Sequence, residues 1–249
     1  MRKPAMSREP ADPFRRDFRK ASCKLITDAA HYRHNLSTLF RDMVEVFFIA
    51  GRNGHEPRDA AWQTREARYM ELVAVYGREI FDAFATLLAE LHKEARDRHG
   101  DLLGEIYQEL QANQKGLGQF FTPYQISSLM AQLSFPESHL LEHIDRHGYL
   151  TACEPTCGSG GMIVAIAETI RNLGHEPLQV LRVMAQDIDP VCWQMTYISC
   201  WLYRIPAKII LGDTIANEER AVVFSPSWFE AAARALPGFE PPELQVAAE

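Results

Sequence analysis

Three glycines within four residues mark the segment of this sequence best suited to hold a ligand. The run Glu154-Pro155-Thr156-Cys157-Gly158-Ser159-Gly160-Gly161 lies between a short apolar run and a helical pattern. Glycines let the backbone approach a ligand closely, and the helix that follows offers unpaired N–H groups. Neither the lysine of a P-loop nor the spacing GxGxxG is present. Because Glu154 would repel phosphate, the turn favours a ligand with an amino group; the alternative is a tight turn without a ligand.

Carboxylates end two further apolar runs. Asp187-Ile188-Asp189 follows the run LQVLRVMAQ, and Gly212-Asp213-Thr214 follows AKIIL. An acid at the end of the second strand of a βαβ unit can hold ribose hydroxyls. The alternative is that Asp187 and Asp189 only cap the helix that starts at Pro190. Open α/β sheets bind ligands at the carboxyl edge, where we expect these acids to gather.

The apolar spacing predicts the elements that position these residues. Short runs rich in strand formers alternate with helical segments, which predicts a parallel α/β sheet. A fourth short run, Ala221–Phe224, predicts a further strand. The expected strands are YLTACEP, LQVLRVMAQD and AKIILGD, the helices between them Met162–Asn172 and Asp189–Tyr203, and the helices before them about 35–52, 64–98 and 101–111.

The charge is unevenly distributed along the chain. The 249 residues carry a formal net charge of −7, which argues against a protein that mainly coats nucleic acid. Residues 1–20 hold seven basic and three acidic side chains, a local net of +4, so the remainder carries −11. We expect residues 1–30 to form a basic, mobile arm; the alternative is an arm that contacts phosphate.

Four motifs, in order, resemble those of a known family. GQFFTP (118–123), EPTCGSGG (154–161), AQDIDP (185–190) and GDT (212–214) look like the S-adenosylmethionine-binding motifs of N6-adenine DNA methyltransferases. They are most similar to the modification subunits of type I restriction systems, over about residues 100–230. The resemblance implies a Rossmann-like methyltransferase domain at 116–230, a helical domain at 31–115 before it, and a tail at 231–249. The cofactor would be S-adenosylmethionine.

The resemblance also implies a role for each motif residue. Phe121, Thr122 and Pro123 would close over the cofactor, and Glu154 would meet its amino group. The remaining cofactor contacts would be Cys157, Gly158 and Gly160 at the methionine part, Asp187 at the ribose, Ile188 on the adenine ring and Asp213 at the adenine amine.

The catalytic motif of that family is missing. It reads Asn-Pro-Pro followed by Phe or Tyr, and this sequence contains no such tetrapeptide. The nearest candidate is Ser225-Pro226-Ser227-Trp228, in which Ser225, Pro226 and Trp228 would be catalytic. The alternative is an ordinary turn at a strand end. The family's sheet also has three more strands, so the domain is expected to be abbreviated, with an open edge covered by the helices, a second copy or another subunit.

Two functional hypotheses follow from these motifs. The first is methyl transfer from S-adenosylmethionine to the N6 amine of adenine in DNA, with the base flipped out of the duplex. The rival is a cofactor-binding but catalytically silent relative that acts as a regulatory or assembly subunit. DNA, a second copy of the chain and a separate specificity subunit are the expected partners.

Other sequence features predict location and exclude alternatives. Five cysteines without a CxxC pair suit free thiols in the cytoplasm, and no apolar run reaches the roughly 20 residues that span a bilayer. The HxxEH spacing at 139–143 suggests a surface helix rather than a zinc site, since no third ligand is evident. Aromatic residues Trp193, Tyr197, Trp201 and Tyr203 suit a packed core more than a base-stacking platform.

Overall fold

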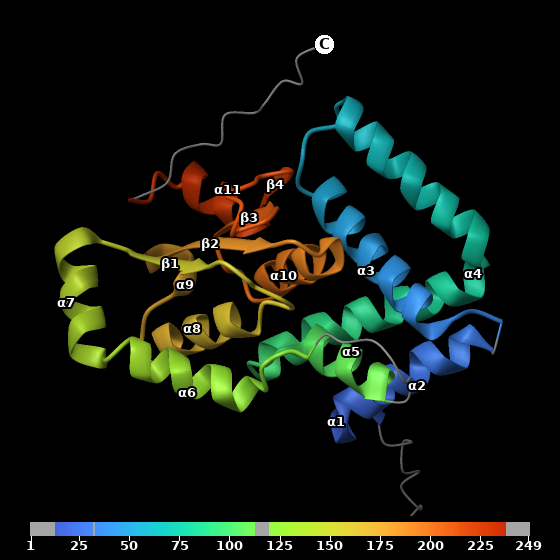
Figure 1. Ribbon diagram of the computed structural model, residues 1–249, viewed down its shortest axis with the longest axis horizontal. Coiled ribbons are helices and arrows are strands. Elements are labelled where there is room, and N and C mark those ends of the chain that lie inside the picture. The colour runs from blue at the N-terminus through green and yellow to red at the C-terminus, as the bar shows by residue number, and fades with distance from the viewer. Residues whose placement is uncertain (1–12, 32, 113–119, 238–249) are drawn as a thin grey trace, which may run out of the picture.

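The computed structural model describes residues 13–31, 33–112 and 120–237 of the chain. In this part, a group of amino-terminal helices packs against an α/β unit built on a four-stranded sheet (Figure 1). A single cluster of buried apolar side chains extends from Phe18 in the first part to Val223 in the second. The helical domain expected at 31–115 therefore shares its core with the α/β unit.

The amino-terminal helices begin where side chains cap them. Asp17, Asn35 and Asp59 each accept a hydrogen bond from a backbone N–H of the helix that follows. The longest of these helices bends at Gly77, whose φ of 70° takes the backbone out of the helical region. The helices are α1 (Pro13–Arg16), α2 (Phe18–Ala30), α3 (Leu36–Asn53), α4 (Ala60–Asp97) and α5 (Leu102–Ala112).

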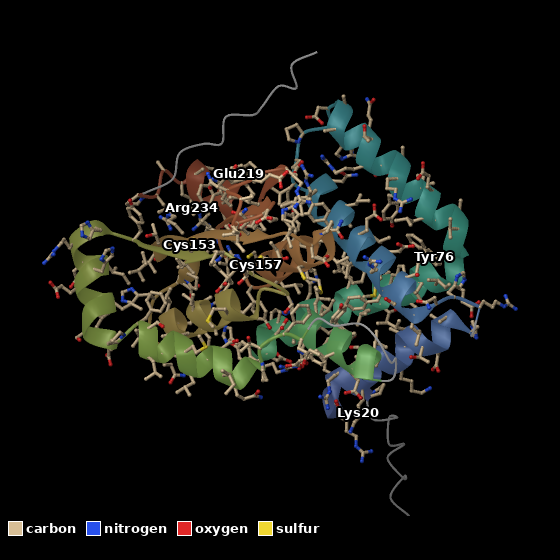
Figure 2. All side chains as sticks on the ribbon, in the orientation of Figure 1. Lys20, Tyr76, Cys153, Cys157, Glu219 and Arg234 are labelled. Atoms are coloured by element: carbon tan, nitrogen blue, oxygen red, sulfur yellow. The ribbon has the colours of Figure 1, made fainter. Side chains whose placement is uncertain are left out.

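Residues 13–30 do not form part of an arm, contrary to the expectation for residues 1–30. Helix α2 buries Phe18, Ile26 and Ala30 and contacts α4 and α5. Its basic residues lie on the outer face, as Lys20 does in Figure 2. The count of basic residues was misleading because one face of a helix can be charged while the other is buried. Residues 1–12 lie outside the described part.

The sheet confirms the expected alternation of strands and helices. Strands β1 (Leu150–Glu154), β2 (Leu181–Asp187) and β3 (Ala207–Leu211) are parallel and adjacent in that order. The fourth strand, β4 (Ala221–Phe224), pairs with β3 in the antiparallel direction. The helices of this unit are α6 (Tyr124–Ser134), α7 (Glu137–His147), α8 (Gly161–Asn172), α9 (Pro177–Val180), α10 (Pro190–Leu202) and α11 (Pro226–Ala233).

Helix α10 joins the sheet to the amino-terminal helices. It contacts β2 and β3 on one side and α3 on the other, while α6 packs on α8. The ring of Phe48 on α3 lies 4.7 Å from that of Trp193 and 5.0 Å from that of Tyr197. Trp193 and Tyr197 are buried, as is Tyr203. The prediction that this aromatic run belongs to the core is confirmed for these three residues.

The opposite face of the sheet is partly uncovered. Met184 on β2 is 45% exposed and Val222 on β4 is 37% exposed, and Cys153 on β1, labelled in Figure 2, is also exposed. A hollow of about 450 Å³ lies over β1, β2 and β3 at this face and is bordered by Trp228. Rossmann-like architecture is therefore present in an abbreviated form, with helices on one face of the sheet and an apolar surface on the other.

Candidate functional site

The glycine-rich turn connects β1 to α8 in a conformation that requires glycine. Gly158 has a φ of 56° and Gly160 a φ of 91°, both in the region that side chains disfavour. A Cβ atom on Gly160 would lie 3.2 Å from Ser199 Cβ, and one on Gly158 would lie 3.1 Å from the Phe121 ring. Space as well as backbone angle therefore excludes side chains at these positions.

Hydrogen bonds from β2 and α10 hold the turn in place. Cys157 N donates to Gln186 O at 2.9 Å, and Gly158 N donates to Asp187 Oδ2 at 2.8 Å. From α10, the Thr196 hydroxyl donates to Gly158 O at 3.0 Å, and Ser199 Oγ donates to Ser159 O at 2.9 Å. The turn is thus fixed on two sides before any ligand binds.

Asp187, the last residue of β2, and Asp189, two residues later, have different roles, a point that the sequence left open. Asp189 caps α10, since its Oδ1 accepts from Val191 N at 2.7 Å. Asp187 instead accepts Gly158 N on Oδ2 and Asp189 N on Oδ1, the latter at 2.9 Å. A carboxylate has about four acceptor sites, so these two bonds leave capacity for hydroxyl groups of a ligand. Ile188 between them is 54% exposed.

The loop after β3 is tied to the loops after β1 and β2. Gly212 N donates to Asp187 O at 2.9 Å, and the Thr214 hydroxyl donates to Pro155 O at 2.5 Å. Asp213 Oδ1 accepts from two backbone N–H groups of its own loop, at 2.9 and 3.1 Å. The structure therefore brings the predicted residues Glu154, Asp187 and Asp213 to one edge of the sheet, on loops joined by hydrogen bonds.

A cleft of about 260 Å³ lies beside the glycine-rich turn. Its walls include five predicted residues, namely Phe121, Thr122, Glu154, Cys157 and Gly158. They also include residues that the sequence analysis missed, among them Asp101, Ser127, Met130, Ser159 and Met162. Pro123 precedes α6 at its margin, while Asp187, Ile188 and Asp213 lie on the neighbouring loops and do not line the cleft. The cleft therefore occupies only one part of the carboxyl edge of the sheet, and the other predicted residues lie farther along that edge.

Burial raises the pKa values of two carboxyl groups and one thiol that line the cleft. It raises the pKa of Asp101 to about 6, although hydrogen bonds from Ser159 and Gly104 act in the opposite direction. It also raises the pKa of Glu154 above its ordinary value, and that of the Cys157 thiol to about 12. Cys157 is therefore a protonated contact group at neutral pH and not a nucleophile.

The residues predicted to be catalytic lie at the other edge of the sheet. Because β4 is antiparallel to β3, its end lies beside the start of β3, and Ser225 N donates to Ala207 O at 2.9 Å. Ser225 is fully buried, and its hydroxyl donates to Ile205 O at 2.7 Å and accepts from Ala207 N at 2.9 Å. Four residue steps of β3, about 13 Å, separate this point from the carboxyl edge.

The two other members of the candidate motif have structural roles at that amino edge. Pro226 is the first residue of α11, and the Trp228 ring packs against Phe224 with centroids 5.3 Å apart. The expectation that Ser225, Pro226 and Trp228 stand beside the cofactor is therefore wrong. Only a fourth strand parallel to the third would end at the carboxyl edge, and β4 runs in the opposite direction.

The profile of a protein family described as N-6 DNA Methylase matches residues 97–232, which is more than half of the chain. The chain belongs to this family. A curated relative, the type I restriction enzyme MpnII methylase subunit of Mycoplasma pneumoniae, is 24% identical over 147 residues. The alignment covers 57% of this chain and 25% of the relative, so the chain spans about a quarter of that protein's length.

Two solved structures are similar at low identity. One is a protein from Listeria monocytogenes described as a class I S-adenosylmethionine-dependent methyltransferase (TM-score 0.46, 12% identity, 88% of this chain and 70% of that chain). The other is the type I restriction-modification methyltransferase subunit of Streptococcus thermophilus (TM-score 0.38, 16% identity, 82% and 58%). Membership of the N-6 DNA methylase family rests on the sequence match.

The cofactor of this family is S-adenosylmethionine, and the cleft of this chain suits its charges. Two carboxyl groups, those of Asp101 and Glu154, line the cleft, and its described walls contain no lysine or arginine. Such a lining favours a ligand with ammonium and sulfonium groups over one with phosphates. Gly158 also lines this cleft, so the wall formed by the glycine-rich turn is backbone rather than a side chain at that position.

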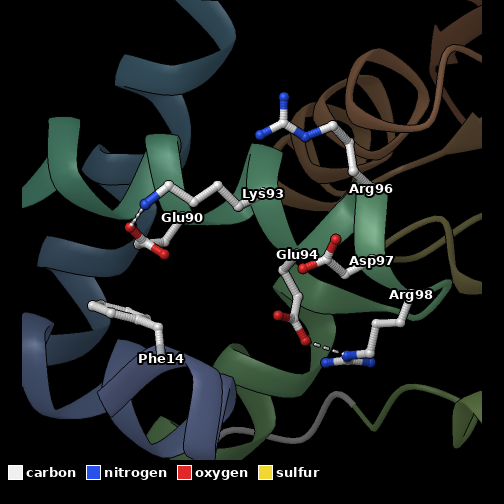
Figure 3. A pocket seen from close by; sticks show the side chains of 7 residues that line it. All are labelled: Phe14, Glu90, Lys93, Glu94, Arg96, Asp97 and Arg98. Atoms are coloured by element: carbon white, nitrogen blue, oxygen red, sulfur yellow. Dashed lines mark hydrogen bonds and ion pairs between the residues drawn. The ribbon is translucent and has the colours of Figure 1, made fainter. Parts of the chain in front are cut away.

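Features elsewhere in the described part do not form a comparable site. A hollow of about 650 Å³ beside α1 and the end of α4 is lined by charged side chains, but Lys93 pairs with Glu90, and Arg98 pairs with Glu94 (Figure 3). Within the described residues there is no group of three potential metal ligands. Each described helix is too short or too polar to cross a bilayer.

Proposed function

We propose that this chain binds S-adenosylmethionine at the carboxyl edge of its sheet and serves the methylation of the N6 amine of adenine in DNA. The observation that carries the proposal is the set of three acid-bearing loops, joined by hydrogen bonds beside a cleft whose described lining residues include no lysine or arginine. Membership of the N-6 DNA methylase family supports the same conclusion.

Each predicted cofactor contact has a role in this proposal. Phe121, Thr122 and Pro123 form the wall that closes over the methionine part, and Glu154 meets its amino group. Cys157, Gly158 and Gly160 allow the close approach, and Asp187 uses its spare acceptor sites for the ribose. Exposed Ile188 covers the adenine ring, and Asp213 accepts from the adenine amine.

The transfer step requires groups that the described residues do not supply at this edge. The bound cofactor provides an electrophilic methyl group, whose bond to sulfur breaks as the bond to the adenine nitrogen forms and the amine loses a proton. Aligned acceptors for the amine hydrogens are the main requirement. Ser225 lies at the opposite edge with its hydroxyl already engaged. We propose that residues outside the described part, or another polypeptide, supply these acceptors.

The second candidate is a catalytically silent relative that binds the cofactor and acts as a regulatory or assembly subunit. The position of Ser225 favours it, because a chain that never methylates would not need acceptors at the carboxyl edge. This hypothesis and the first agree on the cofactor and differ on transfer.

One experiment separates these hypotheses. S-adenosylmethionine binding by calorimetry and methyl incorporation into mixed-sequence DNA would be measured on the chain alone and on the complex purified from its source cells, with Asp187→Ala as the binding-defective control. Binding by the chain with incorporation only in the complex supports the first hypothesis. Binding without incorporation in either sample supports the silent relative, and no binding contradicts both.

The uncovered sheet face supports an assembly. We propose that a second copy of the chain covers the surface around Met184 and Val222, and that a separate subunit supplies DNA specificity. Met184→Glu should shift the chain to monomer in sedimentation, whereas Met70→Glu, at a methionine on α4 that is 54% exposed, should not. A wild-type protein that sediments as a monomer contradicts the dimer.

We also propose that the chain acts in the cytoplasm, where the DNA to be methylated lies. Its five cysteines are free thiols, which suits that compartment.

A further inference from the structure

Helix α5 contacts both walls of the cofactor cleft although it lies before the motifs that resemble the methyltransferase family. At its start, Asp101 Oδ2 accepts a hydrogen bond from the Ser159 hydroxyl in the glycine-rich turn. Two turns later, Gln108 Nε2 donates to Phe121 O at 2.9 Å. Residues seven apart lie on one face of a helix, so a single rigid face holds the turn and the opposite wall.

Packing makes the first of these contacts specific. Asp101 is buried, and its two oxygens have separate partners, because Oδ1 accepts from Gly104 N at 3.0 Å while Oδ2 accepts from Ser159. A Cβ atom on Gly161 would lie 3.2 Å from Asp101 Oδ2, and one on Gly104 would lie 2.0 Å from it. Two glycines on different elements thus leave room for this one carboxylate.

Packing also reinforces the second contact. The Tyr107 ring lies 5.1 Å from the Phe121 ring, and Phe121 in turn faces Gly158 of the turn. Helix α5, Phe121 and the glycine-rich turn therefore form a closed set of contacts around the cleft. A shift of α5 would move both walls relative to each other.

We propose that Asp101 and Gln108 are positioning residues that set the spacing between the two walls of the cofactor cleft. This inference rests on the cofactor site proposed above. A plain helix cap at Asp101 would need only Oδ1; the bond from Oδ2 to Ser159 links the helix to the turn that meets the cofactor. Cofactor affinity thus depends on a helix that itself carries no cofactor-binding motif.

Substitutions that spare the cap can test this proposal. Asp101→Ser keeps a good N-cap but loses the oxygen that reaches Ser159, and Gln108→Ala loses the bond to Phe121. Each should weaken S-adenosylmethionine binding about tenfold in calorimetry, the size expected for a lost hydrogen bond to a charged or buried partner. Ser159→Ala should act as Asp101→Ser does, and the double variant should be no weaker than either single variant.

The control lies on the same helix. Glu109 pairs with Arg19 at 3.4 Å on the outer side, so Glu109→Gln should bind the cofactor as wild type does. Thermal melting identifies any variant that fails to fold, in which case Ser159→Ala and Gln108→Ala carry the test. Wild-type affinity in Asp101→Ser and Gln108→Ala overturns the proposal if Asp187→Ala loses binding; if Asp187→Ala also binds normally, the proposed cofactor site itself is wrong.

A pH series distinguishes positioning from simple stability. Groups that act on Asp101 are Glu105 on α5 and, from the α10 side, Cys192 and Tyr203, while Glu154 shares the cleft. Asp101→Asn keeps the shape of the side chain but removes the charge and replaces one acceptor oxygen by an NH2 donor at every pH. The ratio of wild-type to Asp101→Asn affinity should fall about tenfold as the pH drops from 7.5 to 5, because the wild-type carboxyl becomes protonated. A constant ratio contradicts the role of the carboxylate.

Discussion

The two edges of the sheet both carry polar residues near a turn, yet they use them differently. At the carboxyl edge, Glu154 ends β1 just before a turn whose backbone angles favour glycine, and Asp187 ends β2 and keeps spare acceptor sites. At the amino edge, Ser225 is fully buried and bonds two backbone groups of the β3 entry. Polar residues at one edge can meet a ligand, whereas those at the other hold the backbone.

Arg182 shows the same behaviour at the amino edge. This buried arginine donates to the carbonyl oxygens of Leu181, Gln179 and Pro237, and burial lowers the pKa of its guanidinium to about 10. Its donors serve the backbone around the start of β2. The type of a polar residue therefore does not indicate a ligand site in this protein. What matters is whether its strand places it at the carboxyl edge or the amino edge of the sheet.

Gly160→Val should have the largest effect, and it tests whether the carboxyl edge needs its backbone shape. A valine at a φ of 91° is strained by about 1–3 kcal/mol, and its Cβ would meet Ser199 and Thr196. We expect calorimetry to detect no cofactor binding and melting to show lower stability. Gly174→Val has a similar φ of 83° with open space around it, so it should lose stability but keep binding. Equal loss of binding in both variants would contradict the local explanation.

The pH dependence of stability at Asp101 is the next largest effect. Burial raises its pKa from 3.8 to about 6, so the folded state favours the protonated form; this stabilisation is complete below pH 3.8 and is lost as pH rises through 6. Two pKa units correspond to about 3 kcal/mol. The melting temperature of Asp101→Asn relative to wild type should therefore be higher at pH 7.5 than at pH 4. A difference that is the same at both pH values would show that the carboxyl is not destabilised by burial.

Asp187→Ala tests whether the spare acceptor sites of the Asp187 carboxylate at the carboxyl edge bind the cofactor. Removing the carboxylate leaves Gly158 N and the expected ribose hydroxyls without a charged partner, so binding should weaken by about 1–3 kcal/mol. Asp189→Ala is the matched control, because Asp189 caps α10 and should cost about 1 kcal/mol of stability with little change in affinity. If the two variants bind equally well, the assignment of the ribose to Asp187 is wrong.

Much of the carboxyl edge was predictable from local sequence. A turn rich in glycine between an apolar run and a helix, and acids at the ends of two further runs, suffice to predict the loops at Glu154, Asp187 and Asp213, because parallel strands bring their ends together. Asp101 was not singled out, since its contact with Ser159 joins residues 58 positions apart. An Asp before a helical pattern with a glycine three residues later was the local signal for its cap.

The direction of β4 was the feature that local sequence could not supply. AVVF predicts a strand equally well in either direction, because its apolar pattern is the same when the strand is reversed. The length and path of the loop between β3 and β4 determine the direction of β4. The loop from Gly212 to Arg220 returns directly, since Arg220 N donates to Leu211 O at 2.8 Å, and no helix crosses to the far edge. A parallel strand would need such a crossover.

Ser225→Ala should have the smallest effect on the cofactor and so gives the sharpest contrast between the edges. The substitution leaves Ala207 N and Ile205 O without the hydroxyl that both now use, which should lower the free energy of unfolding by about 1–3 kcal/mol. Cofactor affinity should not change, because about 13 Å of strand separates this residue from the cofactor edge. The measurements are denaturant unfolding and calorimetry on the same preparation. Weakened binding at unchanged stability would mean that Ser225 does act at the cofactor, and the distinction between the edges would fail.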